Sequence, residues 1–143
     1  MKIMEGLGEG GQVPEAWLGF YGTTILRLAC ALFACGKTEE GYGWLEKAFA
    51  VFSLWDGIPD GAETEVGDPM ICGGIRLIKG QSLLLLPDGT REPVSSYSEV
   101  FRWTGGMLYY SMTAPRGWEW FDPVRNEGRF REYVERAKKM AEA

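Results

Sequence analysis

The sequence predicts an α+β fold, in which an antiparallel helical hairpin, a small antiparallel β-meander and a C-terminal helix surround one core. Three observations support this fold class. Two apolar runs, residues 16–35 and 39–55, are separated by only three residues. Residues 70–95 alternate short apolar stretches with turn-forming residues, which is typical of strands. Residues 129–141 carry apolar side chains at helical spacing.

The length of the chain suits one domain. At 143 residues it can bury about two thirds of its unfolded surface. The first residues are rich in glycine, and Gly6-x-Gly8-x-x-Gly11 formally fits a dinucleotide-binding loop. Such a loop follows a strand, and too few residues precede it here. We therefore expect a flexible leader at residues 1–14 and a single domain over residues 15–143; the alternative is a fragment of a longer repeat protein.

The helical hairpin spans residues 15–55. Gly36 favours the end of the first helix, because glycine adopts a left-handed conformation without steric cost. Thr38 is a suitable N-cap for the second helix, and Glu39 and Glu40 suit the positive end of its dipole. A connection of three residues predicts that the two helices run antiparallel.

A loop and a meander follow the hairpin. Residues 56–69 contain three glycines and two prolines, which predicts a loop, and we expect its acidic side chains to be solvated. Residues 75–79 and 82–86 are predicted strands, with a turn at residues 87–90 and a short edge strand at residues 91–94. The strand at 82–86 is apolar on both faces, so we place it in the middle of the sheet.

An aromatic segment opens the last part of the chain, residues 96–143. Ser98 is a candidate cap for a short helix that ends at Gly105-Gly106. Residues 107–113 fit either a helix or a strand, and we favour a helix.

The final helix is predicted at residues 129–141. Before it, Asp122 followed by Pro123 is typical of a helix N-cap with proline at the first position, and Asn126-Glu127-Gly128 interrupts this helix after one turn. Two ion pairs at i,i+4 spacing are expected on the final helix, Glu132 with Arg136 and Glu135 with Lys139.

Part of the hairpin resembles one tetratricopeptide repeat. The resemblance lies in the run LACALFACGKTEEGYGWLEKAFAV and rests on Leu28-Ala29, Leu32, Gly36, Gly41, Leu45 and Ala48. It implies that small residues lie where the two helices touch. The proline that commonly closes such a repeat is missing, with Ser53 and Leu54 near its place, and the predicted strands depart from the family.

The end of the chain carries a second resemblance. The run FDPVRNEGRFREYVERAKK is similar to the closing segment of many bacterial helical-repeat proteins. Together with the hairpin, it implies a C-terminal helical-repeat piece whose last helix caps the array.

Net charge and cysteine content limit the partners and the location that we expect for the protein. The net charge is −5 and no cluster of Lys and Arg stands out, so we expect no binding to nucleic acid. Three cysteines and the lack of an apolar signal region predict a reducing, cytoplasmic location. Residues 17–35 are mostly apolar, but Arg27 lies in their middle, which favours a core helix over a membrane span.

The residues that usually carry catalysis are missing or poorly placed. The chain has no histidine, which removes the commonest general base and metal ligand. Cys30 and Cys35 lie roughly 140° apart around a helix, so they point away from each other and fit buried structural thiols. We expect no cofactor, no metal and no catalytic residues.

Surplus apolar surface is the main functional signal. Helix 39–55 has two apolar stripes, and only one of them can face the other helix of the hairpin. The predicted interaction residues are Trp44, Val51, Trp55, Tyr109, Tyr110, Trp118 and Trp120. We expect a non-enzymatic module of helical-repeat type that binds a partner protein or a second copy of itself, as a homo-oligomer. The alternative is a small-ligand-binding protein or enzyme that uses an aromatic pocket with Arg27 and Glu119.

Overall fold

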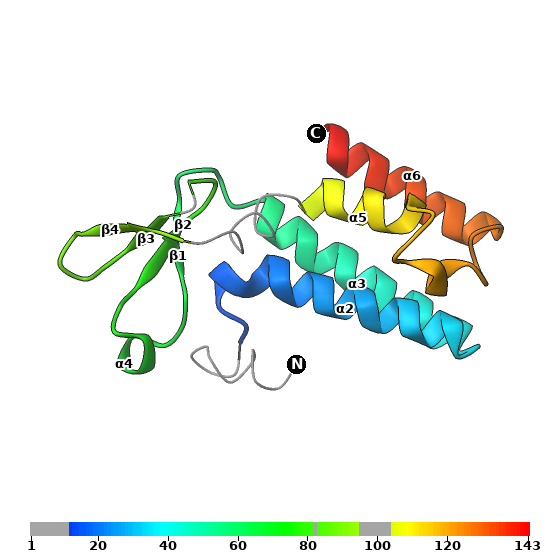
Figure 1. Ribbon diagram of the computed structural model, residues 1–143, viewed down its shortest axis with the longest axis horizontal. Coiled ribbons are helices and arrows are strands. Elements are labelled where there is room, and N and C mark those ends of the chain that lie inside the picture. The colour runs from blue at the N-terminus through cyan, green and yellow to red at the C-terminus, as the bar shows by residue number, and fades with distance from the viewer. Residues whose placement is uncertain (1–11, 82, 95–103) are drawn as a thin grey trace. The chain divides into compact units, whose positions relative to one another are not determined.

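The computed structural model describes residues 12–81, 83–94 and 104–143 (Figure 1). It confirms the predicted α+β class, with helices and a four-stranded antiparallel sheet. Most of the predicted leader and the predicted short helix after Ser98 lie outside the described residues.

Contacts divide the chain into two compact units. The single domain over residues 15–143 stays a prediction. The sheet unit comprises Met1–Tyr21 and Ser53–Arg102, and the helical unit comprises Gly22–Phe52 and Trp103–Ala143. The two helices of the hairpin each have residues in both units.

The predicted hairpin is formed by α2 (Leu18–Ala34), which a 3₁₀ turn η2 (Glu15–Trp17) precedes, and α3 (Thr38–Asp56). Gly36 has a φ of 74°, as its predicted role as a helix stop requires. The amide of Gly36 donates to the carbonyl of Phe33 at 3.0 Å, and that of Lys37 to Leu32 at 2.9 Å. These two bonds make a Schellman motif, which satisfies the last carbonyls of α2.

The sheet is a meander with the order β1-β2-β3-β4, all antiparallel. The predicted strands are confirmed as β2 (Arg76–Ile78), β3 (Leu83–Leu85) and β4 (Arg91–Pro93). β3 is an inner strand, as predicted, and β4 with Pro93 is an edge strand.

Strand β1 (Glu63–Glu65) corrects the prediction of a loop over residues 56–69. Thr64 is fully buried and its hydroxyl donates to the carbonyl of Leu77 at 2.9 Å, whereas the two glutamates are exposed. Only one of the three side chains faces inward, so the segment carries little apolar signal.

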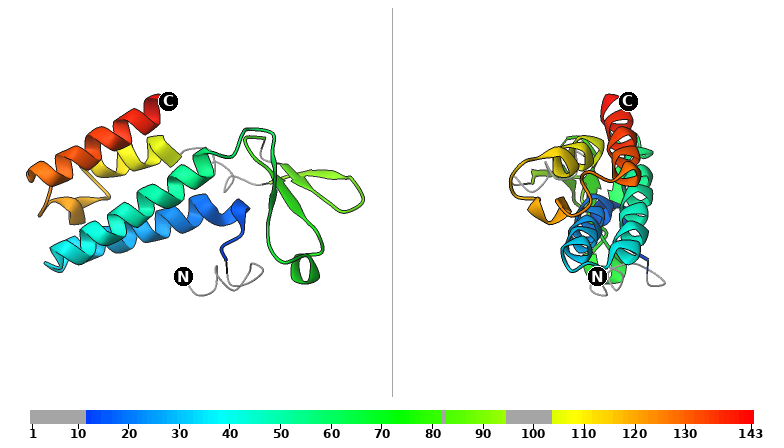
Figure 2. Two further views of the ribbon diagram at one scale, coloured as in Figure 1. Left: turned by 180° about the vertical axis from the view of Figure 1, so that it is seen from behind. Right: turned by 90° about the vertical axis from the view of Figure 1, so that its right-hand side faces the viewer.

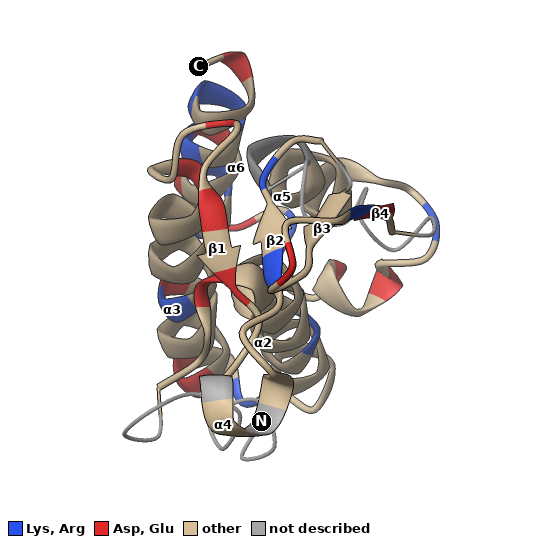
Figure 3. Cartoon of the chain, turned by 90° about the vertical axis from the view of Figure 1, so that its left-hand side faces the viewer, with Lys and Arg blue, Asp and Glu red and all other residues tan. Residues whose placement is uncertain are grey.

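The glutamates appear as the red part of β1 in Figure 3, and Glu63 pairs with Arg76 of β2 at 3.8 Å. A charged edge strand of this kind discourages pairing with other chains. A short helix α4 (Pro69–Cys72) follows β1.

The core of the sheet unit gathers around Trp55. Its buried members are Ala16, Trp55 and Leu77, with half-buried apolar side chains packed around them. The indole N–H of Trp17 donates to the carbonyl of Val66 at 2.7 Å, which ties the start of the hairpin to the chain after β1. The hydrogen bond places Trp17 at the border of this core with its polar atom satisfied.

Lys79 is a buried cation that closes the C-terminal end of α3. Its ammonium donates to the carbonyl of Trp55 at 2.6 Å and to that of Ile58, and it lies 5.0 Å from the Trp55 ring centroid. The last carbonyls of a helix lack partners within the helix, and a cation there also complements the helix dipole. Burial raises the pKa of Asp56 beside it, against the opposing effect of Lys79.

The helical unit adds α5 (Thr104–Thr113), a 3₁₀ turn η4 (Glu119–Phe121) and α6 (Gly128–Glu142) to the hairpin. Figure 2 shows α5 and α6 lying side by side, in extensive contact with each other. The helical assignment of residues 107–113 is confirmed. The prediction that Gly105-Gly106 ends a helix is wrong, because α5 runs through both residues. Packing of the buried Leu108 and Met112 outweighs the low helix propensity of glycine.

Asp122 is not the predicted helix N-cap. It lies at the C-terminal end of η4, and α6 begins only at Gly128. The Asp122 carboxylate accepts from the side chain of Arg125 at 2.6 Å instead of from the first amides of a helix. The predicted final helix is confirmed, one residue longer at each end.

An aromatic cluster forms the core of the helical unit. Phe33 lies 4.9 Å from Tyr42, 5.9 Å from Phe121 and 6.4 Å from Phe130, between ring centroids. Each of the four residues exposes about one per cent of its surface or less. Because they come from α2, α3, η4 and α6, the cluster joins most of the elements of this unit.

Charged side chains join α6 to α3. Arg136 forms a bidentate pair with Glu46 at 2.8 and 3.0 Å, and Tyr133 donates to the same carboxylate at 2.8 Å. Arg129 pairs with Glu39 at 3.0 Å. Within the described residues, neither predicted i,i+4 pair on the final helix is formed, and Arg136 reaches across to Glu46 of α3.

We expect opposite effects of alanine at two glycines of α3. A Cβ at Gly41 meets the ring of Phe33 at 2.6 Å, whereas a Cβ at Gly43 meets nothing within 4 Å. Gly43→Ala should raise the free energy of unfolding by about 0.5–1 kcal/mol through helix propensity. Gly41→Ala should lower it by about 1–2 kcal/mol, because overpacking outweighs that gain. Urea denaturation followed by circular dichroism measures both, and a Gly41→Ala protein as stable as Gly43→Ala contradicts the packing.

Candidate functional site

The predicted interaction residues have very different exposures. Trp44 and Tyr109 are half-buried. Tyr110 and Trp120 are exposed, with 60% and 61% of their surface accessible. Val51, Trp55 and Trp118 are buried.

The second apolar stripe of α3 is therefore not free surface, which corrects the expectation drawn from it. Trp55 packs against Ala16 and Leu77 in the core of the sheet unit. Trp44 is covered in part by Lys47, whose ammonium lies 4.8 Å from the ring centroid. The chain itself covers most of this stripe, so the surplus apolar surface that the sequence indicates lies elsewhere.

Trp120 borders a cavity in the helical unit. This cavity has a volume of about 360 Å³. Its lining comes from α2 and from the segment before and within η4, and comprises Arg27, Cys30, Gly117, Trp118, Glu119 and Trp120. We call it the Trp120 pocket. The alternative sequence hypothesis required Arg27 and Glu119 to meet in an aromatic pocket, and the structure brings both to this one.

Arg27 and Trp118 contact each other in the Trp120 pocket. The guanidinium carbon of Arg27 lies 5.0 Å from the Trp118 ring centroid, within the range of a cation–π interaction. The Trp118 ring stacks on Phe121 at 6.0 Å with an angle of 14° between planes. Since Phe121 is fully buried, Trp118 is fixed to the core and in turn fixes Arg27.

Arg125 holds the segment that carries the pocket's aromatic residues. Its guanidinium donates to the carbonyls of Met112, Ala114 at 3.0 Å and Trp118 at 2.9 Å. It also pairs with Asp122 at 2.6 Å. Sequence reasoning did not single out Arg125, and the signal available for it was the spacing Asp-Pro-x-Arg.

Glu119 is held in its charged form. Hydrogen bonds from its own backbone amide and from that of Gly117 keep the pKa of its carboxyl below the ordinary value. A carboxylate that accepts backbone N–H bonds is a weak proton acceptor and does not serve as an acid near neutral pH.

Cys30 is held in its neutral form. Burial raises the pKa of its thiol to about 11, although the positive charges of Arg125 and Arg27 act in the opposite direction. The thiolate is the reactive species, so this thiol is a poor nucleophile at neutral pH. Neither titratable group of the Trp120 pocket is poised for catalysis, and the arrangement suits the binding of a ligand.

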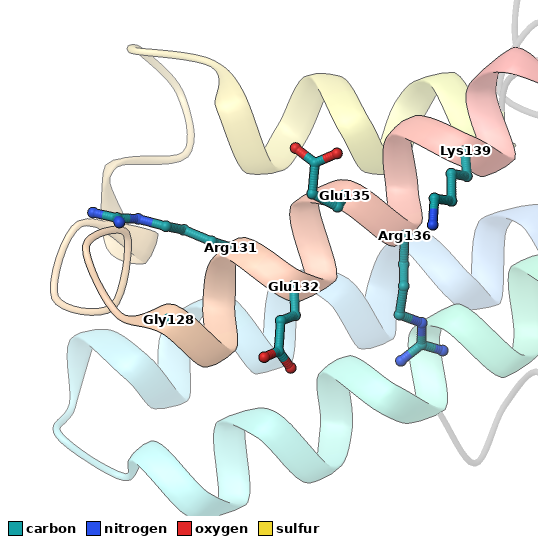
Figure 4. A pocket seen from close by; sticks show the side chains of 6 residues that line it. All are labelled: Gly128, Arg131, Glu132, Glu135, Arg136 and Lys139. Atoms are coloured by element: carbon teal, nitrogen blue, oxygen red, sulfur yellow. The ribbon is translucent and has the colours of Figure 1, made fainter.

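A second hollow, of about 380 Å³, is a weaker candidate. Figure 4 shows its lining, which lies entirely on α6: Gly128, Arg131, Glu132, Glu135, Arg136 and Lys139. Arg136 is already paired with Glu46. A hollow with walls from a single helix cannot enclose a ligand, so we do not assign it as a site.

Other kinds of site find little support. No group of three or more metal-ligating side chains occurs in the described parts of the chain. Glu15–Ala34 is long and apolar enough to cross a membrane, and half of its most apolar window is buried in the protein. Ile25, Leu26 and Ala29 within it are fully buried, as in a core helix.

Arg125→Met should destabilise the helical unit. The change leaves three carbonyls without their donor, and we expect the free energy of unfolding to fall by about 3 kcal/mol. Arg131→Met, on the exposed face of α6, should change it by less than about 0.5 kcal/mol. Urea denaturation gives the comparison, and near-ultraviolet circular dichroism reports whether Trp118 keeps its fixed environment. Equal stabilities of the two variants contradict the role assigned to Arg125.

Two of the free cysteines, Cys30 and Cys35, should react at different rates. Cys30 is buried with a raised thiol pKa, whereas Cys35 is exposed. At pH 8, iodoacetamide should modify Cys35 at least tenfold faster than Cys30 in the folded protein. Mass spectrometry of peptides after timed quenching measures both rates, with urea-unfolded protein as the control in which they converge. Fast modification of Cys30 in the folded state contradicts its assignment as an inert thiol.

The resemblances found in the sequence are not supported by further relatives. Comparison with protein-family models, curated proteins and solved structures finds no match for this chain. The tetratricopeptide-like assignment of the hairpin therefore stays a prediction. The observations that bear on function are those of the Trp120 pocket.

Proposed function

We propose that the chain is a non-enzymatic protein-interaction module and that the Trp120 pocket receives a segment of its partner. The observation that carries this proposal is the exposure of Trp120, at 61%, on the border of a cavity. Tryptophan is strongly enriched among residues that dominate the energy of protein interfaces. An exposed indole beside a preformed hollow offers a partner both an anchor and a recess.

The state of the polar groups supports binding in preference to chemistry. Glu119 stays charged because backbone amides hold its carboxylate, and Cys30 stays neutral because it is buried. The chain contains no histidine that a reaction in the pocket would use as a base. Fixed charges of both signs next to an indole provide orientation and selectivity for a bound segment.

The size of the pocket suits one or two side chains of an extended or helical segment. At about 360 Å³, it lies at the small end of the range for ligand sites. The partner is either another protein or a second copy of this chain. We propose a reducing, cytoplasmic setting for the complex, which the three free cysteines suit.

A small-ligand-binding protein is the second candidate. It is favoured by the convergence of Arg27 and Glu119 on the same cavity. A small molecule that carries complementary groups would use the same residues, without the need for a large surrounding interface.

A screen with displayed random peptides tests the proposed function. We expect the protein to select peptides that bind in the micromolar range, and Trp120→Ala should weaken their binding at least tenfold, about 1.4 kcal/mol or more. Tyr110→Ala removes an equally exposed aromatic side chain on α5, outside the pocket, and should leave binding unchanged.

Three outcomes separate the candidates. No selected peptide, or peptides whose affinity ignores Trp120, contradicts the proposed module. Binding of small aromatic compounds at Trp120 without any peptide favours the second candidate. Light scattering of the free protein decides whether the partner is a second copy, through a concentration-dependent mass that Trp120→Ala abolishes.

A further inference from the structure

Arg27 presents a positive charge at the Trp120 pocket. Its side chain is exposed and lies over the ring of Trp118 at 5.0 Å. In the described part of the chain, no carboxylate forms an ion pair with it, and no oxygen accepts from its N–H groups. A guanidinium carries five donors, and the contact with the ring leaves them for a ligand.

The carboxylate that shares the pocket does not satisfy Arg27. Glu119 is bound by its own backbone amide and by that of Gly117. Arg125 and Arg136 of the helical unit differ in this respect. Arg125 donates to three carbonyls and Asp122, and Arg136 is bidentate on Glu46.

Arg27 is also held in place before a ligand arrives. Trp118, on which it rests, is buried, stacks on Phe121 and has its carbonyl bound by Arg125. Fixing a long side chain costs binding free energy when a ligand must do it. Here the fold has already reduced that cost.

We propose that Arg27 binds a carboxylate of the ligand while an apolar part of the same ligand packs on Trp120. Guanidinium and carboxylate match in shape and form two parallel N–H···O bonds. In a partner segment, the carboxylate is either a C-terminus or an acidic side chain next to an apolar residue. This inference rests on the assignment of the Trp120 pocket as the binding site.

Small probes test the carboxylate directly. We would titrate the protein with 3-phenylpropionate and with its neutral amide, 3-phenylpropionamide. The indole N–H resonance of Trp120, assigned with Trp120→Phe, reports binding. We expect the carboxylate to bind at least fivefold more tightly than the amide.

Variants then assign the effect to Arg27. Arg27→Gln should make the affinities of acid and amide equal, and Arg27→Lys should keep part of the preference because it retains the charge without the planar fork. Arg131→Gln removes one positive charge from α6 and should leave the preference unchanged. Thermal unfolding checks that each variant is folded.

The outcomes distinguish this inference from the proposed function. Equal affinities of acid and amide in the unaltered protein, or a preference that survives Arg27→Gln, overturn the role of Arg27 even where displayed peptides still depend on Trp120. No response of Trp120 to either probe also overturns it. If the probes behave as expected and no peptide binds, the result supports the carboxylate site at Arg27 and contradicts the proposal of a protein partner. Selected peptides with free and amidated C-termini show which carboxylate is recognised.

Discussion

The Trp120 pocket depends on how Arg125 satisfies backbone carbonyls that the chain leaves open. The last carbonyls of α5 have no partner within the helix, and the segment that follows has little regular structure. Arg125 donates to Met112, Ala114 and Trp118 and pairs with Asp122, while about a fifth of its side chain remains exposed. Burying a guanidinium is costly unless its donors are used, and here all of its nitrogens are. The position of Trp118, and with it that of Arg27, follows from this arrangement.

The same surroundings explain why the pocket is inert and yet charged. Burial that fixes Trp118 also removes water from Cys30 and raises its pKa to about 11. The turn that begins η4 directs backbone amides at Glu119 and lowers its pKa. Each group is thereby driven away from the pKa that acid–base or nucleophilic chemistry needs. Recognition has the opposite requirement, because charges that do not change with small shifts in pH give a constant binding surface.

Local signals predicted the helices and most of the sheet, whereas long-range contacts decided the rest. Gly36 and the apolar periodicity were sufficient for the hairpin, and the turn at residues 87–90 for β3 and β4. Strand β1 was missed because only Thr64 faces inward. Arg136 was assigned to Glu132 by spacing, but its partner, Glu46, lies 90 residues away.

The meeting of Arg27 and Glu119 was anticipated as an alternative, since both residue types suit an aromatic pocket. The hydrogen bonds of Arg125 to the segment around Trp118 were not anticipated. Their acceptors are mostly backbone carbonyls, which every residue has, so no residue type marks them in the sequence.

Exposure alone does not distinguish Trp120, because Leu54, Met70 and Tyr110 are about equally or more exposed. Single apolar residues on a surface are ordinary and need no function. Trp120 differs in what surrounds it. It borders a cavity whose floor is fixed by Trp118 and Phe121, and it shares that cavity with a positive and a negative group, whereas the other three line neither hollow. An apolar side chain gains binding energy chiefly where a partner can exclude water on several sides, and only a recess with rigid walls allows this. That is why we place the interaction at Trp120 and not on the stripe of α3.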